Sequence, residues 1–174
     1  MKNQQRKCAL AKRNALSITE RKVFNQIISK KLIPYLENIN AIYLPYESEV
    51  DITAVMENSR QSFAVPKTYP DHCMRFFSYE HTMPLEKSRF GVWEPIGGNE
   101  ITEFDVIVVP LVAFDEECHR LGHGQGFYDR YVKDFRGRVI GVGYECQKLE
   151  HVACEEHDQL LDMVISETSV YIKN

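Results

Sequence analysis

The segment DVIVVPLVAFD, residues 105–115, is the most continuous apolar run in the chain. A strand that is apolar on both faces belongs in the middle of a sheet covered on both sides. Shorter apolar runs, rich in aromatic and β-branched residues, lie before and after it and predict further strands. These runs are AIYLPY (41–46), FAVPK (63–67), MRFFSY (74–79), RVIGVGY (138–144) and MVISE (163–167).

Helical patterns separate the strands. Residues 3–37 carry apolar positions at helical spacing, broken near LSITER, where Ser17 or Thr19 can cap a second helix. DITAVMENSRQ (51–61) has a weak helical period, so residues 41–67 predict a strand, a helix and a parallel strand. With no repeat or linker visible, we expect residues 1–174 to form one three-layer α/β/α domain with a mostly parallel central sheet.

Composition limits the possible functions. The 174 residues are 44% hydrophobic with a formal net charge of −4, which argues against a nucleic-acid partner because that needs a broad cationic field. Five cysteines without a CxxC pair suggest a reducing compartment and no zinc ribbon. No apolar stretch reaches the length of a membrane span. We expect a cytoplasmic protein with no membrane partner, either a monomer or a weak homo-oligomer.

A glycine-rich loop, RLGHGQGFYDR (120–130), follows the central run. Ligands of open α/β sheets bind beyond the carboxyl ends of the strands, so this loop is the candidate site. Gly122, Gly124 and Gly126 lack a Cβ and can adopt positive φ, which lets successive N–H groups converge on an anion. A helix beginning directly after the loop would add partial positive charge, and Arg120 carries a fork of donors for phosphate oxygens. We interpret the loop as a phosphate cradle.

Two carboxylates accompany the loop. Asp129 follows the glycines closely, and an acid beside a phosphate cradle commonly holds a magnesium ion that bridges phosphate oxygens. Asp158, before the last predicted strand, can supply a second carboxylate if the fold brings it beside Asp129. The alternative is a tight strand-to-helix turn in which Arg120 and Asp129 form a surface ion pair. The loop is neither a Walker loop nor a GxGxxG fingerprint, and no nucleophile motif occurs.

Residues elsewhere can complete a site. Lys2 and Arg6 share a helix face and can grip a polyphosphate, although a solvated basic helix end fits them as well. Glu49, just after a strand, can accept hydrogen bonds from an amino-bearing ring, or it is a solvated loop acid. FGVWEPIGG (90–98) can wall a flat heterocycle. We interpret the glycines of GVGY (141–144) as positions of close backbone packing.

VVPLVAFD followed by RLGHGQGFYDR resembles the 5-formyltetrahydrofolate cyclo-ligases, also called 5,10-methenyltetrahydrofolate synthetases. The agreement extends over nearly the whole chain, through KNQQR, LAKRNALS, YLPYESEVDI, FAVPK, WEP and HDQLLDMVISE. The resemblance implies a cytoplasmic ligase of one-carbon metabolism that uses ATP and Mg²⁺ to convert 5-formyltetrahydrofolate to 5,10-methenyltetrahydrofolate, ADP and phosphate. It also implies that the formyl oxygen takes the γ-phosphate, and that N10 attacks the resulting imidate-like phosphate.

The resemblance also assigns roles to residues. Arg120 and Asp129 are the expected catalytic residues, and Asp129 and Asp158 the expected magnesium ligands. The expected ATP contacts are Lys2, Arg6, Arg120, Leu121, Gly122, His123, Gly124, Gln125, Gly126, Phe127 and Tyr128. The expected folate contacts are Leu44, Glu49, His123, Gly124, Gln125, Gly126 and Phe127, so the loop would serve both substrates.

Some residues depart from the family pattern. Leu111 stands where many relatives have Gly, and Phe127 where Tyr is usual, which removes a hydroxyl that can bond to substrate. His123 and Gln125 stand where Gly or a basic residue is common. Two alternative functions are also consistent with these residues. One is a sugar-phosphate isomerase or CoA-transferase relative that needs no ATP, and the other is a non-catalytic folate or nucleotide sensor.

Overall fold

The computed structural model describes residues 1–57, 60–155 and 158–173. It confirms the α/β class. The α-helices are α1 (Lys2–Ala15), α2 (Ile18–Leu32) and α3 (Phe127–Val132), and the 3₁₀ turns are η1 (Ile33–Tyr35), η2 (Thr53–Met56), η3 (Pro70–His72) and η4 (Glu145–Gln147). The strands are β1 (Ile39–Ala41), β2 (Ser62–Thr68), β3 (Met74–Ser78), β4 (Leu85–Lys87), β5 (Trp93–Pro95), β6 (Glu100–Ile101), β7 (Val106–Pro110), β8 (Ala113–Phe114), β9 (Arg120–Leu121), β10 (Arg138–Val142), β11 (Met163–Ile165) and β12 (Val170–Ile172).

The main sheet has parallel strands at its centre and antiparallel strands at its edges. Its eight strands run in the order β12-β11-β10-β7-β1-β2-β3-β6. The neighbours from β11 to β2 pair in parallel, whereas β12, β3 and β6 are antiparallel to their neighbours. β4 pairs with β5 and β8 with β9 in two small separate sheets. The predicted mostly parallel central sheet is therefore confirmed.

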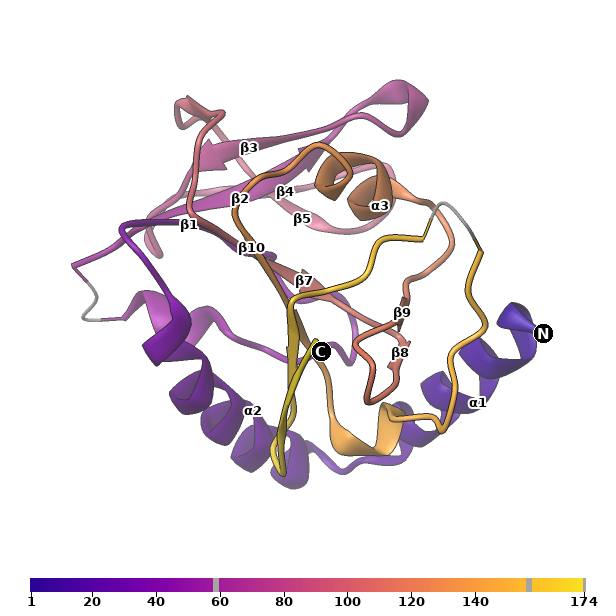
Figure 1. The fold of residues 1–174 in the computed structure, drawn as a ribbon. Helices are drawn as coiled ribbons and strands as arrows, with labels where there is room; N and C mark the ends of the chain where they lie inside the picture. The colour runs from indigo at the N-terminus through magenta and orange to yellow at the C-terminus, as the bar shows by residue number, and fades with distance from the viewer. Residues whose placement is uncertain (58–59, 156–157, 174) are drawn as a thin grey trace.

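β7 lies in the middle because both of its faces are apolar. Val106 and Val108 belong to one buried cluster together with α2, and Ile107 and Val109 to another that includes Val132 of α3. Successive side chains of a strand point to opposite faces, so the two clusters are the cores on the two sides of the sheet. Figure 1 shows α2 on one side of the strands and α3 on the other.

Some predicted elements are shorter than the sequence suggests. The strand predicted at residues 41–46 ends at Ala41, with one further hydrogen bond from Ile42 N to Ala64 O, and Pro45 beyond it has no N–H to donate. The helix predicted at residues 51–61 is only the turn η2, where Asp51 Oδ1 accepts from Thr53 N at 2.9 Å; residues 58 and 59 lie outside the described residues. The predicted parallel pairing of β1 with β2 is confirmed.

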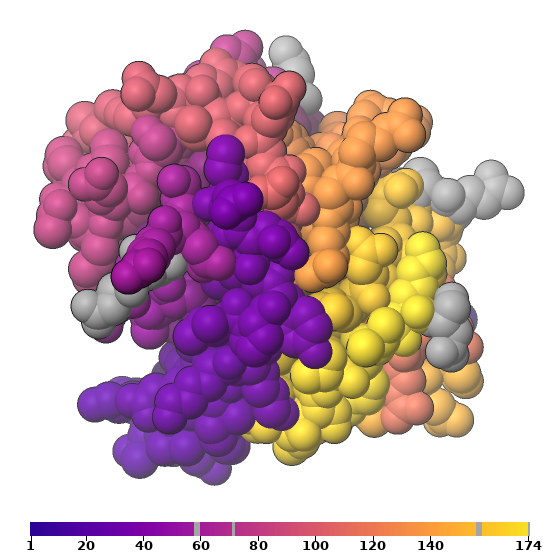
Figure 2. All heavy atoms as spheres, turned by 60° about the vertical axis from the view of Figure 1, so that its left-hand side comes forward, coloured from indigo at the N-terminus to yellow at the C-terminus, as the bar shows by residue number. Residues whose placement is uncertain are grey.

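The two N-terminal helices are confirmed, with Ser17 as the cap of α2. Ser17 Oγ accepts from Glu20 N at 3.1 Å, and Ser17 N donates to Glu20 Oε2 at 2.8 Å, which makes a reciprocal capping box. Further along, Lys31 Nζ donates to the carbonyls of Ser166 and Glu167. Figure 2 accordingly shows the purple segment that contains α2 against the yellow C-terminal strands. Within the described residues, no helix is long and apolar enough to cross a membrane.

Candidate active site

A cavity of about 280 Å³ lies at the carboxyl ends of β1, β2 and β7. It brings together all the residues predicted as contacts, although they come from distant parts of the chain. These residues are Lys2, Arg6, Leu44, Glu49, Arg120, Leu121, Gly122, His123, Gly124, Gln125, Gly126, Phe127, Tyr128, Asp129 and Asp158. The position follows from the rule that open α/β sheets bind ligands at this edge.

Two glycines of the loop are required by their backbone conformation. Gly124 and Gly126 have φ of 93° and 70°, a region that other L residues rarely adopt. In addition, a Cβ on Gly124 would lie 3.6 Å from the Arg6 guanidinium carbon, so the loop lies directly against α1. Arg6 Nε donates to Gly122 O at 2.8 Å, which ties the loop to that helix. Because α3 has only six residues, the anion attraction rests on the cations and loop amides more than on a helix dipole.

Arg120 and Asp129 form a pair inside the site. Arg120 Nη2 donates to Asp129 Oδ1 at 2.6 Å, and the arginine side chain is only 4% exposed. Arg120 also lies over the ring of Tyr128, with its guanidinium carbon 5.7 Å from the ring centroid. Burial raises the pKa of Tyr128, so its hydroxyl stays neutral. The ion pair that the alternative interpretation expected is therefore present, but it does not lie on the surface, because Arg120 is buried against the cavity.

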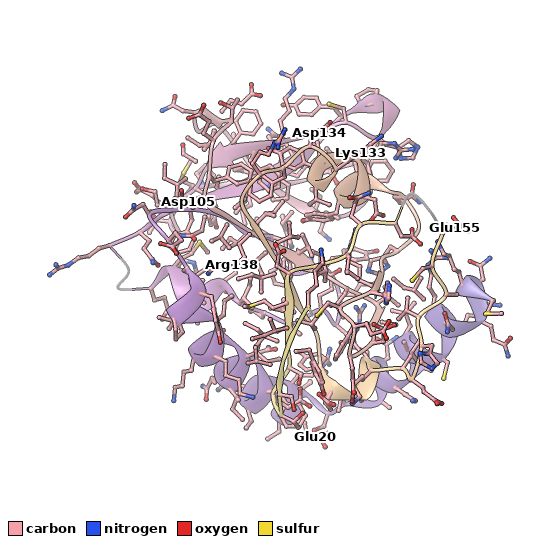
Figure 3. The ribbon with its side chains drawn as sticks, in the orientation of Figure 1. Glu20, Asp105, Lys133, Asp134, Arg138 and Glu155 are labelled. Atoms are coloured by element: carbon pink, nitrogen blue, oxygen red, sulfur yellow. The ribbon has the colours of Figure 1, made fainter. Side chains whose placement is uncertain are left out.

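Lys2 and Asp158 form a second pair across the cavity. Lys2 Nζ donates to Asp158 Oδ2 at 2.6 Å and lies 3.2 Å from Glu155 Oε2. Burial alone would lower the pKa of Lys2, but its hydrogen bonds to Asp158 and Glu155 outweigh this and raise it. Figure 3 shows Glu155 on the segment that passes the start of α1. The first turn of α1 thus places a fully charged ammonium at the cavity.

Glu49 provides a buried carboxylate at another wall of the cavity. One of its oxygens accepts from Tyr46 N at 2.9 Å, and the other lies 3.1 Å from His123 Nε2. The Tyr46 and His123 rings meet edge to face, with centroids 6.2 Å apart. Glu49 is 8% exposed, so it is not a solvated loop acid. His123 links this carboxylate to the glycine loop.

Aromatic side chains close the cavity near Phe127. The Phe127 and Phe90 rings are 5.5 Å apart in a T-shaped arrangement, and Val92 lines the same wall. Of the predicted loop 90–98, only these first residues face the cavity. Trp93 does not line it and instead packs beneath Lys87 Nζ, 5.1 Å from its ring centroid.

Several cavity residues were missed by the sequence reasoning. They are Tyr43, Tyr46, Pro66, Thr68, Met74, Phe90, Val92 and Pro110, of which Phe90 and Val92 were expected only as part of a loop. Tyr43 and Tyr46 were placed in a strand, whereas they follow its end. Pro45 between them was the available signal, because proline has no N–H for a central strand.

The carboxylates fit a magnesium site that a substrate completes. Asp129 and Asp158 both line the cavity and offer the hard oxygen ligands that Mg²⁺ prefers. Among the described residues, no group of three or more His, Cys, Asp or Glu side chains is placed to hold a metal alone. Magnesium is usually bound by one or two carboxylates together with substrate phosphates, so this set of donors suits it.

The fold and the cavity define an α/β protein with a glycine-rich loop at the carboxyl edge of a mostly parallel sheet. The model of the 5-formyltetrahydrofolate cyclo-ligase family matches residues 1–167. The chain belongs to this family and is an enzyme of it.

Known relatives agree with this assignment. The chain is 30% identical to the 5-formyltetrahydrofolate cyclo-ligase of Haemophilus influenzae over 72% of this chain and 74% of that protein. It is 32% identical to the cyclo-ligase of Mycoplasma pneumoniae over 95% of this chain and 98% of that protein. The structure of Aquifex aeolicus 5,10-methenyltetrahydrofolate synthetase superposes with a TM-score of 0.84 at 30% identity, covering 98% of this chain and 92% of that one.

Proposed function

We propose that the chain catalyses the ATP- and Mg²⁺-dependent cyclisation of 5-formyltetrahydrofolate to 5,10-methenyltetrahydrofolate, with release of ADP and phosphate. One observation carries the proposal. The same cavity joins a cationic glycine loop, suited to a polyphosphate, to the buried Glu49 carboxylate, suited to an amino-bearing ring. Two substrates with these groups would meet there.

The reaction is proposed to proceed in two steps. The formyl oxygen attacks the γ-phosphorus, the bond to the bridging oxygen breaks, and ADP leaves. N10 then attacks the activated formyl carbon and loses its proton, and phosphate leaves with the oxygen that it received and takes up that proton. Such transfer asks for alignment and charge neutralisation, and it needs no protein nucleophile.

The chain's residues would supply that neutralisation. Arg120 is proposed to turn its guanidinium from Asp129 toward the transferred phosphoryl group, and Lys2 to move from Asp158 toward the phosphates. Asp129 and Asp158 would thereby be freed to hold Mg²⁺, which would neutralise negative charge on the phosphates. Arg6 would anchor the loop through Gly122 while Leu121 to Tyr128 line the nucleotide.

The folate is proposed to lie on the other side of the glycine loop. Glu49 would accept from the amino-bearing ring, and Leu44 would pack against that ring's face. Gly124, Gln125, Gly126 and Phe127 would form the floor, beside Phe90. His123 contacts Glu49 in the present structure, so it would shift when the ring binds.

A spectrophotometric assay tests the proposal. Purified protein with 5-formyltetrahydrofolate, ATP and Mg²⁺ is expected to produce the absorbance of the methenyl product, and omission of ATP is expected to abolish it. Arg120→Ala should lose the signal, whereas Arg136→Ala, an exposed arginine outside the cavity, should retain it. Absence of product from the wild-type protein would overturn the proposal.

The same assay separates the two alternatives. Turnover of a phosphosugar or a CoA ester without nucleotide would favour the isomerase or transferase. Calorimetric binding of folate or nucleotide without any product would favour the sensor. The pairing of Asp129 and Asp158 with cations in one cavity gives a metal-dependent enzyme more support, because a simple binder has less need of both carboxylates.

The proposal includes a cytoplasmic location and small-molecule partners. A cytoplasmic location is supported by the five cysteines, all of which are free thiols. The net charge of −4 supports small-molecule partners over nucleic acid.

A further inference from the structure

Arg13, in the last turn of α1, is a fully buried arginine outside the cavity. Its Nε donates to Ser48 Oγ at 2.9 Å. Its Nη1 and Nη2 atoms are buried and have no hydrogen-bond partner within the described part of the chain. A buried charge in this state is costly, so its retention calls for a physical reason.

The groups that face Arg13 indicate what this charge serves. Burial lowers the pKa of Arg13, and the carboxylates of Glu49 and Glu47 oppose that shift, together with Tyr43 and Tyr144. Glu49 is itself buried, whereas Glu47 is exposed to solvent. The guanidinium is therefore a buried positive charge that interacts electrostatically with a cavity carboxylate shielded from water.

A short hydrogen-bonded chain joins Arg13 to the backbone that carries Glu49. Ser48 Oγ accepts from Arg13 and donates to Asn14 Oδ1 at 2.5 Å, so the end of α1 grips Ser48 at two points. Residues 46–49 form a tight turn in which Glu49 N donates to Tyr46 O at 3.0 Å. Glu47 in this turn has φ of 53°, a left-handed conformation that a non-glycine residue adopts at a cost. The hydrogen bonds from Arg13 and to Asn14 hold Ser48, the next residue of this turn, and so help to offset that cost.

We propose that Arg13 is a positioning residue for Glu49: it holds the turn 46–49 through its hydrogen bond to Ser48, and its charge attracts the Glu49 carboxylate, so that this carboxylate lines the cavity ready for the folate ring. The inference rests on the proposed folate role of Glu49. Arg13 itself touches neither substrate site, because it does not line the cavity.

A double-mutant cycle tests this role. Arg13→Met removes the charge at similar volume, and Glu49→Gln removes the carboxylate. We expect Arg13→Met to weaken binding of 5-formyltetrahydrofolate, measured by calorimetry without ATP, by about tenfold. Binding of an ATP analogue should change by less than about twofold, and the folate effect should vanish in the Glu49→Gln background. Lys12→Met, on the exposed side of the same helix turn, is the matched control and should change neither affinity.

Two milder variants keep the test decisive if Arg13→Met does not fold. Arg13→Lys retains the charge and should recover part of the folate affinity. Ser48→Ala removes the hydrogen bond while it keeps Arg13, and it should raise the KM for folate without changing the KM for ATP. An equal loss of both affinities, or an unchanged loss in the Glu49→Gln background, would assign Arg13 a purely structural role and overturn the proposal.

The experiment also separates this inference from the proposed function. If Glu49→Gln leaves folate affinity unchanged, the placement of the folate ring at Glu49 is wrong, and the positioning role is wrong with it. If Glu49→Gln weakens folate binding while Arg13→Met and Ser48→Ala do not, the proposed function stands and the positioning role alone fails.

Discussion

At the scale of single residues, every cavity carboxylate already has a partner. Asp129 pairs with Arg120, Asp158 with Lys2, and Glu49 with His123. A cation that leaves such a pair frees the carboxylate for a new partner, so phosphate binding and magnesium binding should support each other.

The first prediction concerns Asp129. Asp129→Asn keeps the size of the side chain but removes its charge, so the Mg²⁺ concentration for half-maximal activity should rise by about tenfold. Asp134→Asn, on an exposed residue just beyond α3 that Figure 3 labels, is the control and should leave the curve unchanged. The measurement is initial rate against Mg²⁺ at fixed ATP. An unchanged curve for Asp129→Asn would remove it from the proposed magnesium ligands.

A second residue-scale prediction concerns Leu111 and Gly141, which lies in β10. A Cβ on Gly141 would lie 2.5 Å from Leu161 Cδ1 and 3.0 Å from Leu111 Cδ2, which bears out the interpretation of close packing. Gly141→Ala should therefore lower the free energy of unfolding by about 1–3 kcal/mol through overpacking.

The control for Gly141→Ala is a second substitution that restores space. Leu111→Ala alone should cost about 2–5 kcal/mol because it leaves a cavity. In the double variant the new methyl should occupy part of that space, so the two losses should sum to more than the double variant shows in urea unfolding. Strict additivity would mean that Leu111 and Gly141 do not share the contact.

A site residue could be predicted where its neighbours in the sequence form a recognisable motif. The glycines, Arg120 and Asp129 sit in one contiguous motif, so the sequence was sufficient to propose them. Arg13 was missed because nothing in a KRNA segment distinguishes a buried arginine from its exposed neighbours. Its burial depends on the turn at Ser48, which only the tertiary fold brings beside it.

At the scale of elements, β7 was predictable because its apolar residues continue on both faces. The end of that strand was not. Residues 105–115 were expected as one run, but β7 ends at Pro110, and β8 belongs to a separate hairpin with β9. Gln147 Nε2 donates to the carbonyls of both Leu111 and Val112, so a distant side chain satisfies the backbone where the strand breaks. A contact so far along the chain leaves no local pattern.

The third prediction concerns η4 and its contact with the C-terminal hairpin. Glu145 accepts from Ser166 Oγ at 2.5 Å and from Tyr171 OH at 2.6 Å. Burial would raise the pKa of Glu145, but hydrogen bonds from Ser166, Tyr171 and Thr168 and the charge of Lys148 outweigh this and lower it below 4.5. A carboxyl with a depressed pKa stabilises the fold above its unfolded pKa, and this contribution is lost as the pH falls through its folded pKa.

The expected result follows from that sign. At about pH 7, Glu145→Gln should lower the free energy of unfolding by about 1–3 kcal/mol, and the difference from wild type should shrink as the pH falls below the ordinary pKa of a glutamate. Urea unfolding at a series of pH values measures it. A difference that stays constant with pH would show that the charge of Glu145 does not contribute.

At the scale of the whole molecule, the site joins the two ends of the chain. Lys2 and Asp158 are 156 positions apart, and Arg6 and Gly122 are 116 apart. The sequence supplied the candidate residues and the sheet class, but their meeting depends on the order β10-β7-β1-β2, which carries all of these loops to one edge. Strand order is set by tertiary packing and has no local signal, so the proximity of Asp129 and Asp158 to one cavity required the structure.

The last prediction uses these contacts between α1 and the glycine loop. An ATP analogue with Mg²⁺ should slow hydrogen exchange in two segments, the first turns of α1 and the loop 122–126, because Lys2, Arg6 and the loop amides would contact the same phosphates. The hairpin of β11 and β12 lies outside the cavity, so its exchange through local opening should be unchanged. At about 100 times its dissociation constant, the analogue should add about 2.7 kcal/mol to the free energy of unfolding.

The matched variant for this prediction is Arg6→Ala. It removes the hydrogen bond from α1 to Gly122 O, so nucleotide should still protect the loop but should protect α1 much less. Lys7→Ala, an exposed neighbour on the same helix that does not line the cavity, should behave as wild type. Equal protection of α1 in the wild-type and Arg6→Ala proteins would mean that α1 is ordered independently of the glycine loop, and that the nucleotide does not join the two ends of the chain through Arg6.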